Sequence, residues 1–221
     1  MTLKKIKKRI KYLVTYLPKK VGVYSLYCLR RKGELKNVGW FRSFRDGMPV
    51  DSEGNPILWM NYAIMHFIEK RINQEMTVFE YGCGNSTFWW ANRTKQVVSC
   101  EHSKKWYEKM KYAVPANVEL YHVDLQYGGE YSKKVSEYHE RFDIIVIDGR
   151  DRVNCAKNCL FALKKDGVII WDNSNREYYQ NGYQYLLKNG YKRIDFKGMG
   201  PVTVNSQCAS IFYKTENCLG I

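Results

Sequence analysis

A predicted strand that runs into two glycines and then into a helix constrains this chain more than any other feature. Residues 78–79 are β-branched and aromatic, and such residues favour a buried strand. Gly82 and Gly84 follow, and glycine lets the backbone turn tightly close to a ligand. Asn85 or Ser86 can then cap a helix over residues 88–92. This order places free amide groups at the carboxyl end of a strand, where open α/β sheets hold cofactors.

The rest of the chain predicts an α/β fold in which strands and helices alternate. The apolar run at 142–147 is the clearest strand, and its lack of polar alternation indicates a parallel sheet covered on both faces. Only a loop, residues 198–207, separates the last two strands, which predicts an antiparallel C-terminal pair. The other strands are predicted at 96–101, 118–123, 168–171, 191–196 and 208–213. Helices are predicted at 56–73, 103–112, 153–163 and 177–188, with a polar helix or loop at 131–139.

Positive charge is concentrated at the N-terminus. Residues 1–32 hold 11 lysines and arginines and no acidic residue. The whole chain has 36 basic and 22 acidic residues, so 25 basic residues remain for the rest, which is nearly neutral. A near-neutral body argues against a nucleic-acid partner for the domain itself.

The same N-terminal segment predicts a basic amphipathic helix over residues 3–17. Its apolar residues recur at helical spacing, and basic residues cover most of its other faces. Such a helix can lie on an anionic membrane surface. Alternatively, its apolar stripe packs on the domain or on a second subunit. No apolar run is long enough for a transmembrane helix. The apolar positions are Leu3, Ile6, Ile10, Leu13 and Leu17.

These patterns divide the chain into three parts. Residues 1–20 form the basic helix, 21–55 a short helix and a lid-like segment, and 56–221 the main domain. The segment 33–55 is rich in turn residues and interleaves aromatic residues with arginines, so it can cover a substrate or anchor the loop to the domain. The interleaved residues are Trp40, Phe41, Arg42, Phe44 and Arg45.

Seven scattered cysteines, with no Cys-x-x-Cys pair, predict a reduced intracellular protein rather than a disulfide scaffold. We therefore expect a cytoplasmic location. Membrane contact through the arm would place the protein at the inner face of the membrane.

The motifs follow the order found in class I S-adenosylmethionine-dependent methyltransferases. Glu80-x-Gly82-x-Gly84 resembles that family's first motif, Glu101 resembles its ribose-binding acid, and Asp124 falls where the family often contacts adenine. The resemblance covers roughly residues 56–214 and implies a Rossmann-like methyltransferase fold with a mostly parallel seven-stranded sheet. It also implies S-adenosylmethionine as cofactor. The implied cofactor-binding residues are Glu80, Gly82, Gly84, Asn85, Ser86, Glu101, His102, Asp124 and Asp148.

A second, partial resemblance is to the catechol-type O-methyltransferases. Asp148 and the pair Asp172-Asn173 look like the three metal ligands of that family, and oxygen ligands of this kind suit Mg²⁺. Alternatively, Asp148 caps a helix or contacts the cofactor, and Asp172-Asn173 forms a turn. Residues 149–152 depart from that family's pattern.

Residues 56–62, 148–154 and 171–177 also resemble a group of uncharacterised bacterial methyltransferases often associated with surface-glycan synthesis. This resemblance implies a hydroxyl on a glycan, or on another small or lipid-linked molecule, as the methyl acceptor.

Methyl transfer to a hydroxyl needs a group that takes the proton. The predicted catalytic residues are Asp148 or Asp151 acting directly, or a metal held by Asp148, Asp172 and Asn173. Arg150 and Arg152 would bind an anionic part of the acceptor, unless they form salt bridges to Asp151 or Glu177. Two other functions stay open at this point. They are a non-catalytic interaction protein with this fold, and an RNA methyltransferase whose basic arm follows phosphates.

Overall fold

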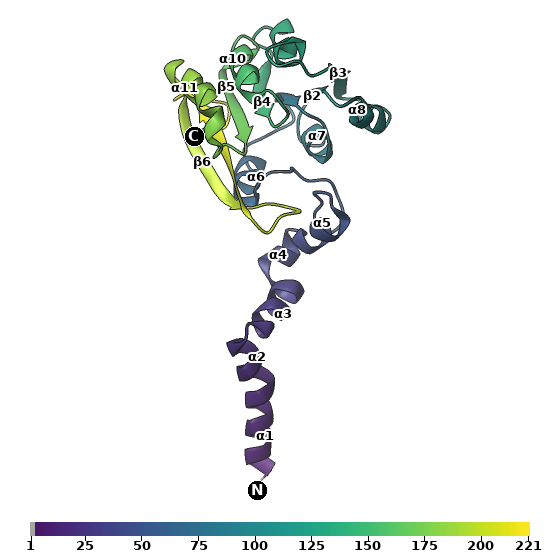
Figure 1. Ribbon diagram of the computed structural model, residues 1–221, viewed down its shortest axis with the longest axis vertical. Coiled ribbons are helices and arrows are strands. Elements are labelled where there is room, and N and C mark those ends of the chain that lie inside the picture. The colour runs from purple at the N-terminus through teal and green to yellow at the C-terminus, as the bar shows by residue number, and fades with distance from the viewer. Residues whose placement is uncertain (1–2) are drawn as a thin grey trace.

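The computed structural model describes residues 3–221 as an α/β domain with a helical arm at its N-terminus (Figure 1). The domain is built on one seven-stranded sheet in the order β3-β2-β1-β4-β5-β7-β6. The strands are β1 Thr77–Tyr81, β2 Gln96–Glu101, β3 Val118–His122, β4 Phe142–Ile147, β5 Leu163–Asp172, β6 Lys192–Met199 and β7 Ser206–Tyr213.

The sheet confirms the predicted topology. Strands β1 to β5 are paired in parallel, and β7 runs antiparallel to both β5 and β6. All six residues of β4 are buried, as expected for a central strand of a parallel sheet, and its one charged residue, Asp143, pairs with Lys164. The strand order reverses direction between β1 and β4, and this switch point is where such sheets hold ligands.

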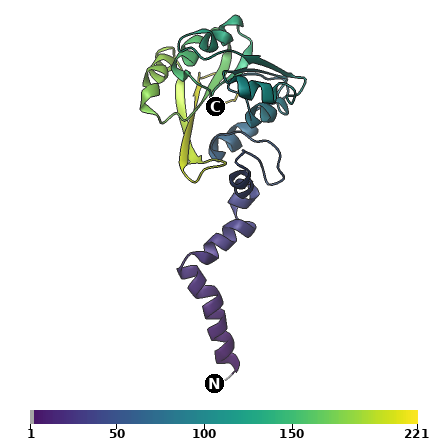
Figure 2. The same ribbon diagram turned by 45° about the vertical axis from the view of Figure 1, so that its right-hand side comes forward.

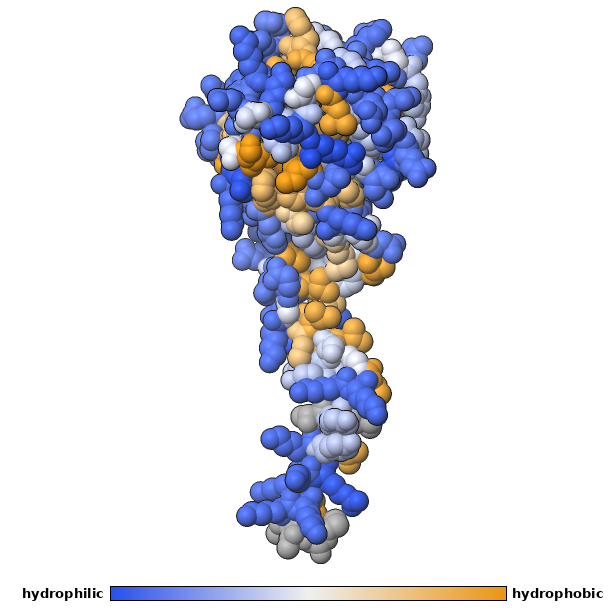
Figure 3. All heavy atoms as spheres, turned by 90° about the vertical axis from the view of Figure 1, so that its left-hand side faces the viewer, coloured by the Kyte–Doolittle hydropathy of each residue, from blue (hydrophilic) through white to orange (hydrophobic). Residues whose placement is uncertain are grey.

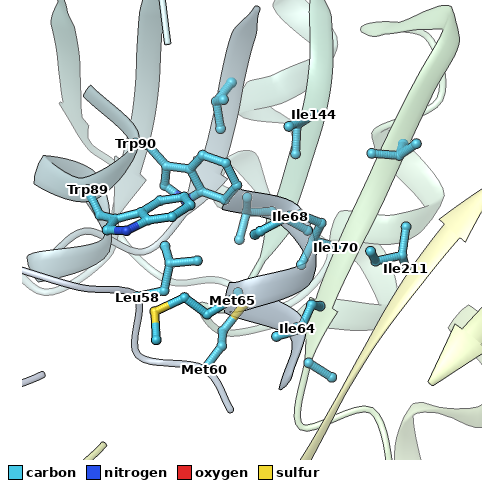
Figure 4. Close-up of a cluster of buried hydrophobic side chains, with 14 of the residues drawn as sticks. Leu58, Met60, Ile64, Met65, Ile68, Trp89, Trp90, Ile144, Ile170 and Ile211 are labelled. Atoms are coloured by element: carbon cyan, nitrogen blue, oxygen red, sulfur yellow. The ribbon is translucent and has the colours of Figure 1, made fainter. Parts of the chain in front are cut away.

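Helices cover both faces of the sheet, so its core has two layers. Successive residues of a strand point to opposite faces. Val78 therefore joins the cluster under α6 and α7, and Phe79 joins the cluster under α10 and α11. Figure 4 shows the first cluster, with Trp89 and Trp90 packed beside Leu58. The helices are α6 Tyr62–Glu69, α7 Asn85–Ala91, α8 Lys104–Met110, α9 Glu130–Lys133, α10 Arg152–Asn158 and α11 Gln180–Lys188.

The predicted helix over 56–73 begins six residues late, at Tyr62. The side chain of Asn61 caps it by accepting a hydrogen bond from the Ile64 amide at 3.1 Å. Pro56 lies before the helix and forms a β-bridge with Val50. The start predicted at Pro56 was wrong because the helix begins where a side-chain oxygen can cap it, and Asn61 supplies that oxygen whereas Pro56 does not.

The predicted helix over 153–163 is also shorter than expected. Helix α10 ends at Asn158, and Leu163 already begins β5, five residues before the predicted start of that strand. The run from 159 to 163 is apolar and largely buried, and periodicity does not separate a buried helix end from a buried strand.

The segment 33–55, expected to be irregular, contains two short helices. They are α4 Glu34–Asn37 and α5 Trp40–Asp46. The hydroxyl of Ser43 ties α5 to the following loop, because it donates to the Val50 carbonyl at 2.6 Å and accepts from the Val50 amide at 2.9 Å. The loop is therefore anchored to the helix from within the segment.

The N-terminal arm projects away from the domain (Figures 1 and 2). It consists of α1 Leu3–Lys11, a π-helical segment Tyr12–Tyr16, α2 Leu17–Lys20 and α3 Val23–Lys32. Residues 1–2 of the predicted 1–20 segment, and the side chains of Leu3 and Leu17, lie outside what the structure describes. The side chains of Ile6, Ile10 and Leu13 are exposed and do not pack on the domain. Over residues 3–221, no helix has the length and apolar character needed to span a membrane.

Candidate functional site

A cavity of about 650 Å³ opens at the carboxyl ends of the central parallel strands. Most of the predicted site residues line it. They are Glu80, Gly82, Gly84, Asn85, Ser86, Glu101, His102, Asp148, Arg150, Arg152, Asp172 and Asn173. The lining residues that were not predicted include Met48, Pro49, Trp59, Trp106, Arg176 and Gln207.

The glycine turn after β1 needs glycine at one position and shares a tight contact with the turn after β4. Gly82 has a φ of 96°, in the left-handed region that disfavours other residues. Opposite it, a Cβ atom on Gly149 would lie 2.0 Å from Tyr131 Oη and 3.1 Å from the Tyr81 carbonyl oxygen. The two turns can therefore approach each other only because Gly149 has no side chain.

The carboxyl group of Glu80 stabilises the glycine turn through buried hydrogen bonds. It is buried and accepts hydrogen bonds from the hydroxyls of Thr87 and Ser99 on the same oxygen. The Thr87 hydroxyl in turn accepts from the Gly84 amide at 3.0 Å. Burial raises the pKa of Glu80 to about 8 despite these two donors. Glu80 is therefore mostly protonated at neutral pH and connects β1, β2 and α7.

Glu101, at the end of β2, is held at the cavity by two backbone amides. Its Oε2 accepts from the Cys83 amide at 3.0 Å, and its Oε1 accepts from the Ser103 amide at 2.7 Å. His102 Nδ1 lies 3.1 Å from Oε1, but the geometry is not that of a hydrogen bond. Each carboxylate oxygen has about two acceptor sites, so Glu101 can still accept from a pair of vicinal hydroxyls.

Trp106 provides a flat apolar wall beside this carboxylate. Its indole Nε1 donates to the Cys83 carbonyl oxygen at 2.5 Å, and its ring lies 3.9 Å from the place of a Cβ atom on Gly84. Ser103 caps α8 by accepting from the Trp106 amide at 3.3 Å, which fixes the start of the helix. Trp106 was not predicted, although the sequence shows a large aromatic residue in the first helical turn after Glu101, the acid at the end of β2.

Arg152 occupies the space between the two aspartates at the ends of β4 and β5. Its Nη2 donates to Asp148 Oδ1 at 2.9 Å, and its Nη1 lies 4.0 Å from Asp172 Oδ2 and donates to the Asp172 carbonyl. Its Nε donates to the Gly149 carbonyl at 3.0 Å. Arg152 is buried, and its hydrogen bonds go to the protein itself. It is therefore not available to bind an acceptor as predicted, and its ion-pair partner is Asp148 rather than Asp151 or Glu177.

The same arrangement does not fit the predicted Mg²⁺ site. Magnesium takes a nearly octahedral shell of oxygens, but a permanent guanidinium charge already neutralises Asp148 beside Asp172. A dication between these carboxylates would be repelled by Arg152. In residues 3–221, no cluster of three His, Cys, Asp or Glu side chains could hold a metal.

Burial raises the pKa of both Asp148 and Asp172, and the charge of Arg152 acts in the opposite direction. Asp172 is 4% exposed, and its Oδ1 has no hydrogen-bond partner. A buried acceptor atom without a partner costs free energy. Asp172 Oδ1 is therefore suited to receive a hydrogen bond from a molecule bound in the cavity.

Two predicted site residues lie outside the cavity. Asp151 is buried in a left-handed conformation, where it accepts from the Gly128 amide at 2.7 Å and from Asn154 Nδ2 at 2.8 Å. These bonds join two loops, and Asp151, predicted to take a substrate proton, does not line the cavity. The side chain of Asp124 is 95% exposed beside His122, and the structure does not bring it to the cavity.

Asn85 and Ser86 line the cavity but do not cap α7, because Gly84 holds the N-cap position. Asn85 Nδ2 donates to the Pro49 carbonyl at 2.7 Å, and Ser86 Oγ accepts from the Trp59 amide at 3.2 Å. These two bonds fix the chain over the mouth of the cavity. Only Met48 and Pro49 of the lid-like segment reach the cavity, while its aromatic and arginine residues surround a separate hollow.

No family model and no curated protein matches this sequence. Several solved structures are similar in fold. A precorrin 8W decarboxylase from Methanobacterium thermoautotrophicum aligns with a TM-score of 0.53 and 18% identity, over 68% of this chain and 86% of that protein. A tRNA methyltransferase from Aquifex aeolicus aligns with a TM-score of 0.55 and 12% identity, over 72% of this chain and 70% of the other.

A spermidine synthase from Thermotoga maritima aligns with a TM-score of 0.52 and 15% identity, over 79% of this chain and 65% of that protein. The chain therefore has the Rossmann-like fold of class I S-adenosylmethionine-dependent methyltransferases, as the sequence motifs predicted. The fold alone does not specify the reaction, because a spermidine synthase shares it.

Proposed function

We propose that the protein is an S-adenosylmethionine-dependent methyltransferase that acts on a hydroxyl group of a glycan or of another small or lipid-linked acceptor. The observation that carries this proposal is Glu101, whose carboxylate is held by two amides at the rim of a cavity beside the glycine turn. A carboxylate in this position can accept hydrogen bonds from both hydroxyls of a ribose.

The residues around Glu101 suit the remaining parts of the cofactor. Trp106 offers an apolar wall for a planar base, and Gly82 leaves room for the amino-acid end. When bound, S-adenosylmethionine supplies a methyl group activated by a sulfonium charge. The protein then has to orient the acceptor oxygen in line with that methyl group and receive its proton.

Asp172 is the proposed proton acceptor. Asp172 lines the cavity and its Oδ1 lacks a hydrogen-bond partner, while Asp148 beside it is already paired with Arg152. Because burial raises the pKa of Asp172, its carboxylate is a stronger base than an exposed aspartate. Asn173 lines the cavity at the next position and can help to orient the acceptor.

Two arginines support an acceptor that carries negative charge. Arg150 and Arg176 are exposed, and both line the cavity. Arginine binds carboxylates and phosphates through a planar pair of donors. Trp59, 43% exposed, lies at the same cavity and offers a flat surface for a sugar ring. A hydroxyl on an anionic or phosphorylated glycan fits these groups.

The test is methyl transfer from S-adenosylmethionine labelled in its methyl group to a panel of acceptors, comprising phosphorylated sugars, neutral sugars and transfer RNA. We expect transfer to a phosphorylated sugar, with loss of at least about 100-fold in rate for Asp172→Asn, as for removal of a general base. Glu216→Gln, an exposed carboxylate far along the chain, is the control. Labelling of RNA alone would reject the proposed acceptor class.

A further inference from the structure

We propose that residues 3–32 form a docking arm for an anionic lipid bilayer, independently of the reaction in the cavity. The arm stands away from the domain (Figures 1 and 2), and the side chains that the structure describes in α3 are not buried, so they can meet an external surface. This extends the expected membrane contact from residues 3–17 to the last helix of the arm, α3.

The first half of the arm supplies the charge. Helix α1 has six basic residues among its nine and no acid in its first turn. Lys5, Lys8 and Arg9 surround a shallow hollow together with Tyr12. Anionic lipid surfaces attract such clusters, and the attraction decreases with added salt.

The second half supplies the apolar surface. No residue of α3 is buried, and Val23, Leu26 and Tyr27 are all more than half exposed. Their spacing of three and four residues places them on one face of the helix. Figure 3 shows hydrophobic side chains gathered along the middle of the arm, with hydrophilic ones at its tip.

Basic and aromatic side chains also gather where the arm joins the domain. A hollow of about 540 Å³ lies where the arm meets the domain. Its arginines and lysine come from three successive helices, and its aromatic residues come from α5. Its charged and aromatic lining residues are Arg30, Lys36, Trp40, Phe41, Arg42, Phe44 and Arg45. Aromatic and cationic side chains together are typical of the interfacial region of a bilayer.

This combination favours a membrane over RNA or a second copy of the chain. RNA phosphates would pair with the lysines, but they would leave the aliphatic side chains of α3 in water. A second arm would bring another segment with 11 positive charges and no negative ones against the first. An anionic bilayer can neutralise the charge and bury the apolar face at the same time.

The experiment is sedimentation of the full chain with two kinds of vesicle, one of phosphatidylcholine alone and one in which half of the lipid is phosphatidylglycerol. We expect the protein to pellet with the second kind only, and less at high salt. The charge variant is Lys5→Glu, Lys8→Glu, Arg9→Glu, and the apolar variant is Val23→Gln, Leu26→Gln, Tyr27→Gln. Each should weaken binding by at least about tenfold.

Matched controls lie on the domain. Lys165→Glu, Lys188→Glu, Lys192→Glu changes three exposed charges, and Tyr112→Gln, Phe161→Gln, Val204→Gln changes three exposed apolar residues. Both should bind vesicles like the unaltered chain, and thermal unfolding checks that all variants are folded.

Failure to pellet, or an apolar variant that binds as well as the unaltered chain, would overturn the proposal. Binding of single-stranded RNA without vesicle binding would assign the arm to RNA. A dimer that is lost in the apolar variant, without vesicle binding, would assign it to a second copy.

Discussion

Arg152 Nη2 lies 2.9 Å from Asp148 Oδ1, so a side chain of the protein neutralises the acidic end of the cavity. Removing this guanidinium would leave the buried carboxyl group of Asp172 and the partly buried one of Asp148 without their cation. We expect Arg152→Met to lower the free energy of unfolding by about 3–5 kcal/mol, as measured by urea denaturation at pH 7. Arg150→Met, two residues earlier in the chain and exposed, should change it by less than about 0.5 kcal/mol. Equal effects of the two variants would show that the ion pair between Arg152 and Asp148 contributes nothing to the free energy of unfolding.

Methyl transfer should not require a divalent metal, because Arg152 occupies the place between Asp148 and Asp172. Activity measured after dialysis against a chelator should equal activity with added Mg²⁺. A loss on chelation that Mg²⁺ restores would mean that Arg152 moves aside to admit a cation.

Glu80 should make stability depend on pH. Its pKa is about 8 in the fold and 4.5 when unfolded, so the folded state binds the proton more tightly. The stabilisation is fully present below pH 4.5 and is lost as pH rises towards 8, by up to about 1.4 kcal/mol per pH unit.

Glu80→Gln keeps the acceptor oxygen for Thr87 and Ser99 but cannot ionise. Its free energy of unfolding should therefore fall less between pH 5 and pH 8 than that of the unaltered chain, by urea denaturation. Glu216→Gln, an exposed control, should show the unaltered slope. Parallel curves for all three proteins would contradict the raised pKa.

Gly149 should not tolerate a side chain. Its Cβ would lie 2.0 Å from Tyr131 Oη, so Gly149→Ala must push apart the turns after β1 and β4, at a cost of about 1–3 kcal/mol. Gly198→Ala is the matched control, because the nearest atom to its Cβ would be 3.8 Å away. Similar melting temperatures for the two variants would refute this account of the turn.

Much of the cavity could be predicted from the sequence because parallel strands end at one edge of a sheet. Glu80, Glu101, Asp148 and Asp172 stand in or directly after such strands, so their meeting follows from the strand order alone. The same reasoning explains why the C-terminal strand pair was predicted, since its short loop permits only an antiparallel connection.

The remaining positions depend on how helices and loops rotate against the sheet. Asp151 and Arg152 are adjacent, yet one turns away to bind Gly128 and the other turns into the cavity. Asp151 adopts a left-handed backbone conformation just before α10, and the apolar pattern of the sequence does not predict this conformation. Trp59 lines the cavity, and its amide donates a hydrogen bond to Ser86, which lies 27 residues later in the chain. This contact depends on tertiary packing alone.

The most direct test of the cofactor site is calorimetric titration of S-adenosylhomocysteine into the unaltered chain, Glu101→Gln and Glu108→Gln. Glu101 accepts from the amides of Cys83 and Ser103, and a glutamine would place a donor against one of them. We expect binding by the unaltered chain and the exposed Glu108 variant, and affinity lower by about 10- to 100-fold for Glu101→Gln, the loss typical of one charged hydrogen bond. No heat of binding at millimolar ligand with the unaltered chain, or equal affinity in all three proteins, would contradict the proposed site.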